Sequence, residues 1–276
     1  MKTEQDVVDG TAEVVTWWLT EREKKFAGGL KDTMNVNPFM LPLVSAMHGI
    51  DSPDELAEML LGAHLVGGHN TGFGKLVDEK LLPRVFDTKK LDGAYRSTTP
   101  PYSQAAFNDI DHVVPRAGHV DLLSLKSSPW TINLSNARDL NTSFAQIRDH
   151  QIEPNPGKYG EIAMGVIYGT AAALTDKYHI LRGETAAQRQ KHKVVDVTDV
   201  VNVYAGRKLW TWINDGEDRT QDWILTGIQN AAASVGAPAT RKALIAKFVA
   251  SQSTLSNFLK ADGSIDWHAF LSSVNG

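Results

Sequence analysis

Residues 108–128 read NDIDHVVPRAGHVDLLSLKSS, and this stretch decides the central part of the expected fold. Apolar residues alternate with polar ones on both sides of Ala117-Gly118, which is typical of the two strands of a hairpin. We expect the turn at these two residues, because glycine readily adopts the positive φ that a two-residue hairpin loop needs. A turn centred there places Asp111 directly opposite Ser124 on the neighbouring strand.

The same hairpin predicts a polar cluster on one side of the sheet. Residues two apart on a strand share a face, so Asp111, Ser124 and Lys126 are expected to lie together. A carboxylate and an ammonium among apolar neighbours are costly unless they are paired, hydrated or bound to a metal. The pattern alone fits either a cross-strand ion pair between Asp111 and Lys126 or a reactive site. His112 points to the opposite face and is interpreted as structural.

The bulk composition narrows the class of protein. The chain has 276 residues, of which 42% are hydrophobic and 22% charged, as expected for one large domain or a core with an added lobe. A formal net charge of -4 argues mildly against nucleic acid as a partner, although 28 Lys and Arg residues are enough for a local basic cleft. Without cysteine, a metal site would need oxygen or imidazole ligands. No apolar run reaches signal or membrane-spanning length, so we expect a cytoplasmic protein with no membrane partner.

Periodicity predicts a mixed α/β core with the hairpin in its middle. We expect a long loop at residues 87–107, which Lys89, Lys90 and Arg96 make locally basic, as suits either phosphate contact or an ordinary surface loop. The expected strands besides the hairpin lie at 161–168 and 177–181, with a strand-like piece at 194–206. The expected helices lie at 4–26, at 52–65 with Gly67-Gly68 as its end, from about 72 with a kink near Pro83, and at 136–149, 221–233 and 240–258.

The helix that starts near residue 72 carries two acids close to the hairpin in the expected order of elements. Asp78 falls at the border of its apolar face and Glu79 on the far side. An acid at such a border can reach a site against which the helix packs. Asp78 is therefore a candidate to join the cluster on the hairpin.

Asp111 together with Ser124-Leu125-Lys126 resembles the PD-(D/E)xK signature of a superfamily of nucleases. The chemistry of that signature is hydrolysis of a phosphodiester. An aspartate and a main-chain carbonyl hold a hard divalent cation such as Mg²⁺ through oxygen. The cation polarises the scissile phosphate and lowers the pKa of a bound water. The lysine orients or activates the attacking water and offsets the charge that develops on the phosphate.

A longer resemblance covers nearly the whole chain, from the N-terminal helix with its tryptophans to the DG-x-x-x-WH stretch at 262–268. The chain is similar to the type II restriction endonucleases that cut the degenerate site RGGNCCY. The segments that carry this similarity are NPFM (37–40), TGFGKLVDEKLLPR (71–84), IDHVV (110–114), LSLK (123–126), LTDKY (174–178), ILRG (180–183) and NVYAG (202–206).

The resemblance implies a restriction-endonuclease-like α/β fold, in which a central mixed sheet is flanked by helices. It implies a single nuclease domain over 1–276, with its core at about 70–185 and helical additions at 1–69 and 195–276. The enzyme would be a Mg²⁺-dependent homodimer that cuts both strands of quasi-palindromic double-stranded DNA and leaves 5′-phosphates. A cognate DNA methyltransferase is expected in the same cell. A structure-specific or repair nuclease, or a catalytically inactive DNA-binding protein, are the alternatives.

Three residues take roles from the resemblance. Asp111 is the implied metal ligand, Lys126 the catalytic lysine, and the main-chain carbonyl of Leu125 a further metal ligand. Ser124 stands at the catalytic position where the signature has its second acid, so another residue must supply that acid.

Asp78 is the first choice for the replacement acid, and Glu79 and Asp139 are in reserve. The residues that would read the bases of a GC-rich site need guanine-facing donors, which are usually arginine or lysine. The sequence does not rank the candidates Arg96, Arg138, Lys177 and Arg182.

Overall fold

A computed structural model describes residues 1–27, 40–50, 52–149, 159–236 and 257–275. Most of the helix expected at 240–258 lies outside these ranges. The chain divides into two compact units. We call residues 1–14 and 74–229 the sheet unit and residues 15–73 and 230–276 the helical unit.

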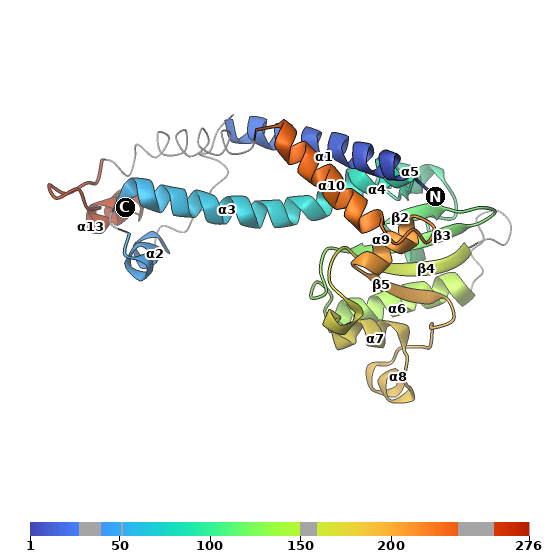
Figure 1. Ribbon diagram of the computed structural model, residues 1–276. Helices are drawn as coiled ribbons and strands as arrows, with labels where there is room; N and C mark the ends of the chain where they lie inside the picture. The colour runs from blue at the N-terminus through green and yellow to red at the C-terminus, as the bar shows by residue number, and fades with distance from the viewer. Residues whose placement is uncertain (28–39, 51, 150–158, 237–256, 276) are drawn as a thin grey trace. The chain divides into compact units, whose positions relative to one another are not determined.

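A five-stranded mixed sheet forms the centre of the sheet unit (Figure 1). Its strands follow one another in space as in sequence, and β2 pairs antiparallel with both β1 and β3. Strands β3, β4 and β5 run parallel. The expected mixed α/β class is confirmed. The strands are β1 (Lys89–Lys90), β2 (His112–Pro115), β3 (Val120–Lys126), β4 (Tyr159–Val166) and β5 (Val201–Ala205).

The central hairpin has the register that its sequence predicts. His112 pairs with Leu123, and the Arg116 N–H donates to the His119 carbonyl at 3.0 Å across the loop. Gly118 takes a φ of 87°, as a turn at this position requires. Asp111 lies one residue before β2, and its N–H donates to the Leu123 carbonyl at 2.8 Å, so it lies beside the end of β3 that carries Ser124.

Helices cover both faces of the sheet (Figure 1). On one face, α6 (Leu134–Asp149) buries Leu140 and Phe144 in a core with residues of β3 and β4. The Asn133 side chain starts this helix by accepting the Asn136 N–H at 2.9 Å. On the other face, α9 (Arg207–Ile213) packs at Gly165 of β4, where a Cβ would meet Leu209 Cδ1 at 2.9 Å.

The helix that carries Asp78 differs from the expectation. One helix, α3 (Pro53–Leu76), continues through Gly67-Gly68 instead of ending there, because a glycine inside a helix costs only about 1 kcal/mol relative to alanine. It passes directly into a π-helical turn, η2 (Val77–Leu81), and then into α4 (Leu82–Phe86). Pro83 lies in the first turn of α4, where its missing N–H is tolerated.

Two further expectations are wrong. Residues 177–181 form helix α7 (Asp176–Arg182) rather than a strand, since a short apolar run does not distinguish the two. The stretch 87–107 is not one loop, because it holds β1, a short helix α5 (Gly93–Thr98) and a 3₁₀ turn η3 (Ala105–Phe107).

The remaining helices agree with the periodicity or occupy segments for which it made no prediction. Near the expected bounds lie α1 (Glu4–Ala27) and α10 (Thr220–Ser234). The others in the sheet unit are α8 (Ala186–His192) and a 3₁₀ turn η4 (Ala171–Ala173).

The helical unit has a small apolar core of its own. Leu41 of α2 (Met40–His48) and Phe270 of α13 (Trp267–Asn275) are buried there with Leu56 and Ile265. Ser52 accepts the Glu55 N–H at 3.2 Å, as its N-cap signal predicts. Among the described residues, no helix is both long and apolar enough to cross a membrane.

Candidate active site

Asp111 is held at the open end of the central hairpin by its own backbone. Its N–H donates to the Leu123 carbonyl and its carbonyl accepts the Leu91 N–H, both at 2.8 Å. Its side-chain Oδ2 accepts the Leu125 N–H at 2.6 Å. The carboxylate is therefore fixed beside the Leu125 peptide, at the end of β3.

Burial raises the pKa of Asp111, and the negative charge of Asp78 adds to the shift. The Leu125 N–H and the positive charges of Lys90 and Lys126 oppose it without cancelling it. The protein thus keeps a partly buried carboxylate whose charge is incompletely compensated. Such groups are more frequent at functional sites than elsewhere.

Asp78 is the second acid of this site, and two donors hold it. The Lys90 Nζ lies 2.6 and 2.5 Å from the two carboxylate oxygens, and His112 Nε2 lies 2.8 Å from Oδ1. His112 is fully buried, and its Nδ1 lies 3.0 Å from Thr88 Oγ1. Because a carboxylate only accepts, Nε2 of His112 carries the hydrogen in this contact.

The pKa values of the two acids are shifted in opposite directions. Burial acts to raise the pKa of Asp78, but hydrogen bonds from His112 and Lys90 outweigh it and the net shift is downward. The pKa of Asp111 is raised instead. Two neighbouring carboxylates with pKa values pushed apart are a common arrangement in acid–base and metal sites.

Lys126 and Ser124 both lie on β3, next to the Leu125 N–H that Asp111 accepts. Lys126 forms no ion pair with Asp111, so the cross-strand ion pair is wrong as an account of the cluster, although the Lys126 charge does act on Asp111. The Ser124 hydroxyl is fully buried and has no hydrogen-bond partner within the described chain. An unpartnered polar atom next to a charged cluster indicates a place that the folded chain alone does not satisfy.

The reserve acids lie elsewhere. Glu79 is exposed on the far side of η2, as its helical phase predicts. Asp139 lies on the exposed side of α6, with Oδ2 3.5 Å from Ser135 Oγ. The charge of Asp78 acts on Asp111, and no comparable effect comes from Glu79 or Asp139.

A hard divalent cation suits the donors at this site. Within the described residues, no cluster of three or more His, Cys, Asp or Glu side chains forms a metal site. The candidate set is the carboxylates of Asp78 and Asp111 with the carbonyl of Leu125, all of them oxygens of the kind that Mg²⁺ prefers, and Lys90 contacts both oxygens of Asp78. Oδ1 of Asp111 accepts no hydrogen bond from a described residue and is free for a cation. Waters would complete the coordination, as is usual for Mg²⁺.

Sequence reasoning missed three members of this site. The sequence predicts a loop at Lys90 and a structural role for His112, and it gives no signal for Thr88. All three surround Asp78. Thr88 and Lys90 are two residues apart, so a reading of this segment as a strand would have placed both on one face.

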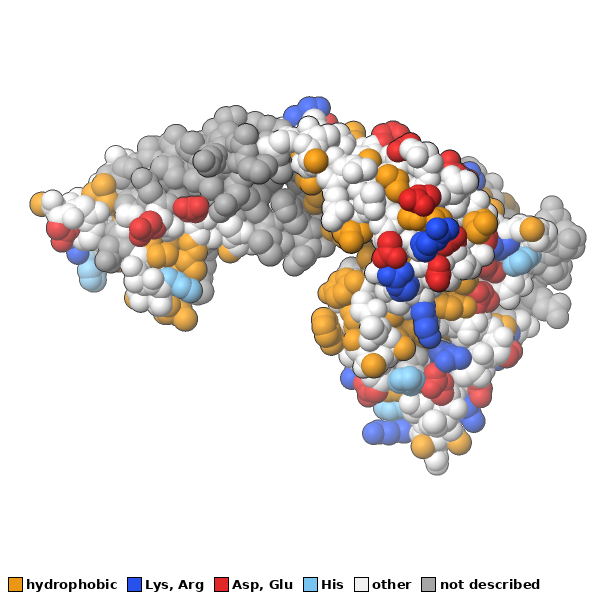
Figure 2. All heavy atoms as spheres, viewed as in Figure 1, with side chains coloured by type: hydrophobic (Ala, Val, Ile, Leu, Met, Phe, Trp, Pro, Cys, Tyr) orange, Lys and Arg blue, Asp and Glu red, His pale blue; other side chains and the backbone are white. Residues whose placement is uncertain are grey.

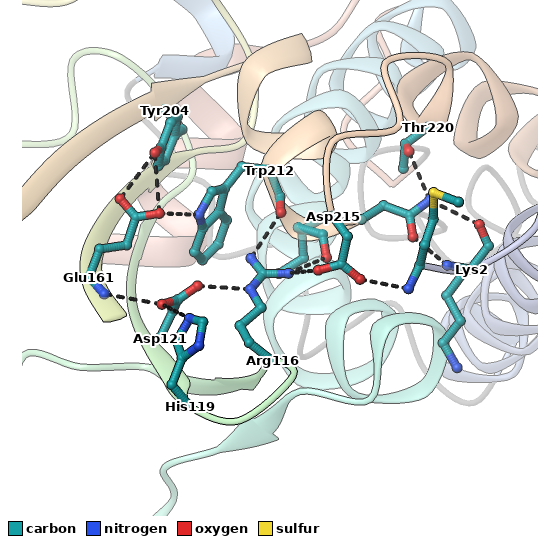
Figure 3. Close-up of polar contacts among 12 residues, drawn as sticks. Lys2, Arg116, His119, Asp121, Glu161, Tyr204, Trp212, Asp215 and Thr220 are labelled. Atoms are coloured by element: carbon teal, nitrogen blue, oxygen red, sulfur yellow. Dashed lines mark hydrogen bonds and ion pairs between the residues drawn. The ribbon is translucent and has the colours of Figure 1, made fainter. Parts of the chain in front are cut away.

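A second polar network lies at the closed end of the hairpin and lines a pocket of about 570 Å³ (Figure 3). Arg116 Nε donates to Asp121 at 2.8 Å, and its Nη1 donates to Asp215 at 2.6 Å. Its Nη2 donates to the Trp212 carbonyl at 2.9 Å, and the guanidinium lies 4.7 Å from the centre of that indole ring. The arginine thus ties the hairpin loop to α9.

Glu161 of β4 completes this second network (Figure 3). Its carboxylate accepts the Trp212 Nε1–H at 2.5 Å and the Tyr204 hydroxyl at 3.0 Å. Since Asp121 and Asp215 pair with Arg116, and Glu161 is held by hydrogen bonds from Trp212 and Tyr204, we interpret the network as structural. The open cluster around Asp111 remains the candidate active site.

Three of the four residues proposed to read bases have partners in the fold. Arg96 donates to the carbonyls of Leu91, Phe107 and Ile110, which makes it a structural residue. On the side of the sheet unit turned to the viewer in Figure 2, acidic and basic side chains lie among one another. Lys177 pairs with Asp176, Arg182 pairs with Glu184, and Arg138 is exposed on α6.

No protein-family model matches the chain, and no curated protein matches it at a significant level.

Proposed function

We propose that this protein is a Mg²⁺-dependent, site-specific deoxyribonuclease of the type II restriction class. Its substrate would be double-stranded DNA with a GC-rich quasi-palindrome of the RGGNCCY type, cut to leave 5′-phosphates. The observation that carries the proposal is the cluster at the open end of the hairpin, where Asp111 accepts the Leu125 N–H at 2.6 Å on the strand that carries Lys126, and where the charge of Asp78 acts on Asp111. A mixed sheet with a helix leading into an antiparallel pair supports a restriction-endonuclease-like core.

Each residue of the cluster has a role in this proposal. Asp111, Asp78 and the Leu125 carbonyl would hold Mg²⁺, which supplies Lewis acidity and a water of lowered pKa. Lys126 would orient the attacking water and offset negative charge on the phosphate, and within the described residues its ammonium forms no hydrogen bond or ion pair that would prevent this. Ser124 occupies the position of the signature's second acid, and Asp78 supplies the missing carboxylate.

A double-stranded substrate implies that the enzyme acts as a dimer. Two strands of opposite direction are cut most simply by two active sites related by a two-fold axis. We therefore propose a homodimer with one site per strand. A cognate methyltransferase would protect the cell's own DNA.

Digestion of plasmid DNA tests the proposal. With Mg²⁺, the purified protein should produce discrete fragments whose ends map within RGGNCCY-type sites, and EDTA should abolish the products. Asp111→Asn, Asp78→Asn and Lys126→Ala should each lower the cleavage rate by about 10²-fold or more while sequence-specific binding persists. Glu79→Gln, one residue from Asp78 but exposed, is the matched control and should cut at the wild-type rate.

Two other functions remain as outcomes of the same work. The buried, unpartnered Ser124 in place of an acid favours a protein that binds DNA without cutting it. Tight specific binding with no cleavage in Mg²⁺ or Mn²⁺ would establish that reading. Cleavage of branched but not linear DNA would identify a structure-specific nuclease on the same core.

A further inference from the structure

Two lysines act on the acids of the candidate site, and they do so differently. The Lys126 ammonium acts on Asp111 through its charge but forms no hydrogen bond or ion pair within the described residues. The Lys90 ammonium instead contacts both carboxylate oxygens of Asp78, at 2.5 and 2.6 Å. The chemistry of the signature has a role for one lysine, so the second requires its own explanation.

Lys90 already serves as the cation of the two-acid cluster. Its charge acts on Asp111 as well as on Asp78, so one ammonium offsets negative charge on both. A divalent ion shared by these carboxylates would perform the same electrostatic task. A cation on Asp78 would also repel an ammonium that remained at hydrogen-bond distance from the same oxygens.

The two donors on Asp78 differ in their freedom to leave. His112 is fully buried and is held on its other side by Thr88. Lys90 is 27% exposed and extends from the two-residue strand β1, so its flexible side chain has a route to water. His112 can therefore keep Asp78 in place when Lys90 moves away.

We propose that Lys90 occupies the cation position of the metal-free site and that a divalent metal ion must displace it to bind. Lys90 is thus a built-in competitor that weakens metal binding, and His112 is the positioning residue that keeps the Asp78 carboxylate ready. This inference rests on the metal site of the proposed function.

Metal titration of the full-length protein without DNA tests the inference. Ca²⁺ and Mn²⁺ binding would be measured by calorimetry for the wild type, Lys90→Met and Lys90→Gln. Both variants should bind about tenfold tighter or more, because a positive charge next to a divalent ion is removed. Lys89→Met is the matched control, because Lys89 is the exposed neighbour on the same strand, and its affinity should stay within about twofold of wild type.

Each result gives a distinct answer. Equal or weaker metal binding by both Lys90 variants, or no binding by any of the proteins, would overturn the inference. Circular dichroism establishes that the variants are folded, and Lys90→Gln keeps a donor for Asp78 where Lys90→Met does not. If Lys90 variants bind metal more tightly but the wild type cuts no DNA, the competitor is real and the nuclease proposal fails. If the wild type cuts DNA and the variants bind no tighter, the inference alone fails.

Discussion

At the scale of single residues, the charges that the candidate site needs for activity lower the stability of the fold. Asp111 is partly buried, and the like charge of the neighbouring Asp78 disfavours its ionised form. Natural active sites often retain such unfavourable charges because the chemistry needs them.

We predict that Asp111→Asn abolishes cleavage and yet stabilises the metal-free fold by about 1 kcal/mol, since it removes a poorly compensated charge. Thermal unfolding in EDTA measures the effect, and the exposed Glu79→Gln should leave the midpoint unchanged. A lower midpoint for Asp111→Asn would show that the carboxylate stabilises the fold.

A second residue-scale prediction concerns alkaline pH. Burial, together with the negative charge of Glu161 and the hydrogen bond to it, raises the pKa of Tyr204 from 10.0 to about 12. The unfolded tyrosine ionises first, so this contribution to stability is complete below pH 10 and is lost as the pH rises towards 12.

Tyr204→Phe should therefore lose less stability than wild type between those pH values, by on the order of 1 kcal/mol. Urea unfolding at several pH values provides the measurement, with the exposed Tyr168→Phe as control. Identical pH profiles for wild type and Tyr204→Phe would refute the assignment.

At the scale of elements, the hairpin is attached at both ends. Its closed end is tied to α9 by Arg116, whose ion pair with Asp121 leaves the two side chains only 10% and 6% exposed. Removing one partner of a buried ion pair leaves the other charge without compensation.

Arg116→Ala should lower the free energy of unfolding by about 3 kcal/mol. Arg207→Ala is a suitable comparison, because the Arg207–Asp222 pair is exposed to solvent and its loss should lower the free energy of unfolding far less. Denaturant unfolding of both variants gives the two values. Equal losses would mean that burial of the Arg116 pair does not matter.

At the scale of the whole molecule, the proposed substrate predicts the oligomeric state. A dimer with one site per strand converts supercoiled plasmid to linear DNA with little accumulation of nicked circles. Sedimentation velocity should give twice the mass of one chain at the concentrations used for cleavage. A monomer that accumulates nicked circles would contradict the proposed homodimer.

How far the sequence predicts the structure differs from segment to segment. The hairpin and its register follow from the residues because alternation and a glycine turn are local signals. Residues 177–181 were expected to form a strand and form a helix, since their apolar run is too short to show a period. Gly67-Gly68 does not end α3, because the cost of glycine in a helix is small beside that of ending a long helix.

The sequence by itself determined the register of the hairpin and the placing of Lys126 on the same strand as Ser124, because these relations follow from strand geometry over a few residues. The helical phase ranked Asp78 ahead of Glu79 and Asp139, but the tertiary structure alone decided that the charge of Asp78 acts on Asp111 and that Lys90 and His112 hold the Asp78 carboxylate. Those contacts join segments 12 to 34 residues apart, from a π-helical turn, an edge strand and the hairpin. Their distances depend on how the helix packs on the sheet, which no local pattern encodes.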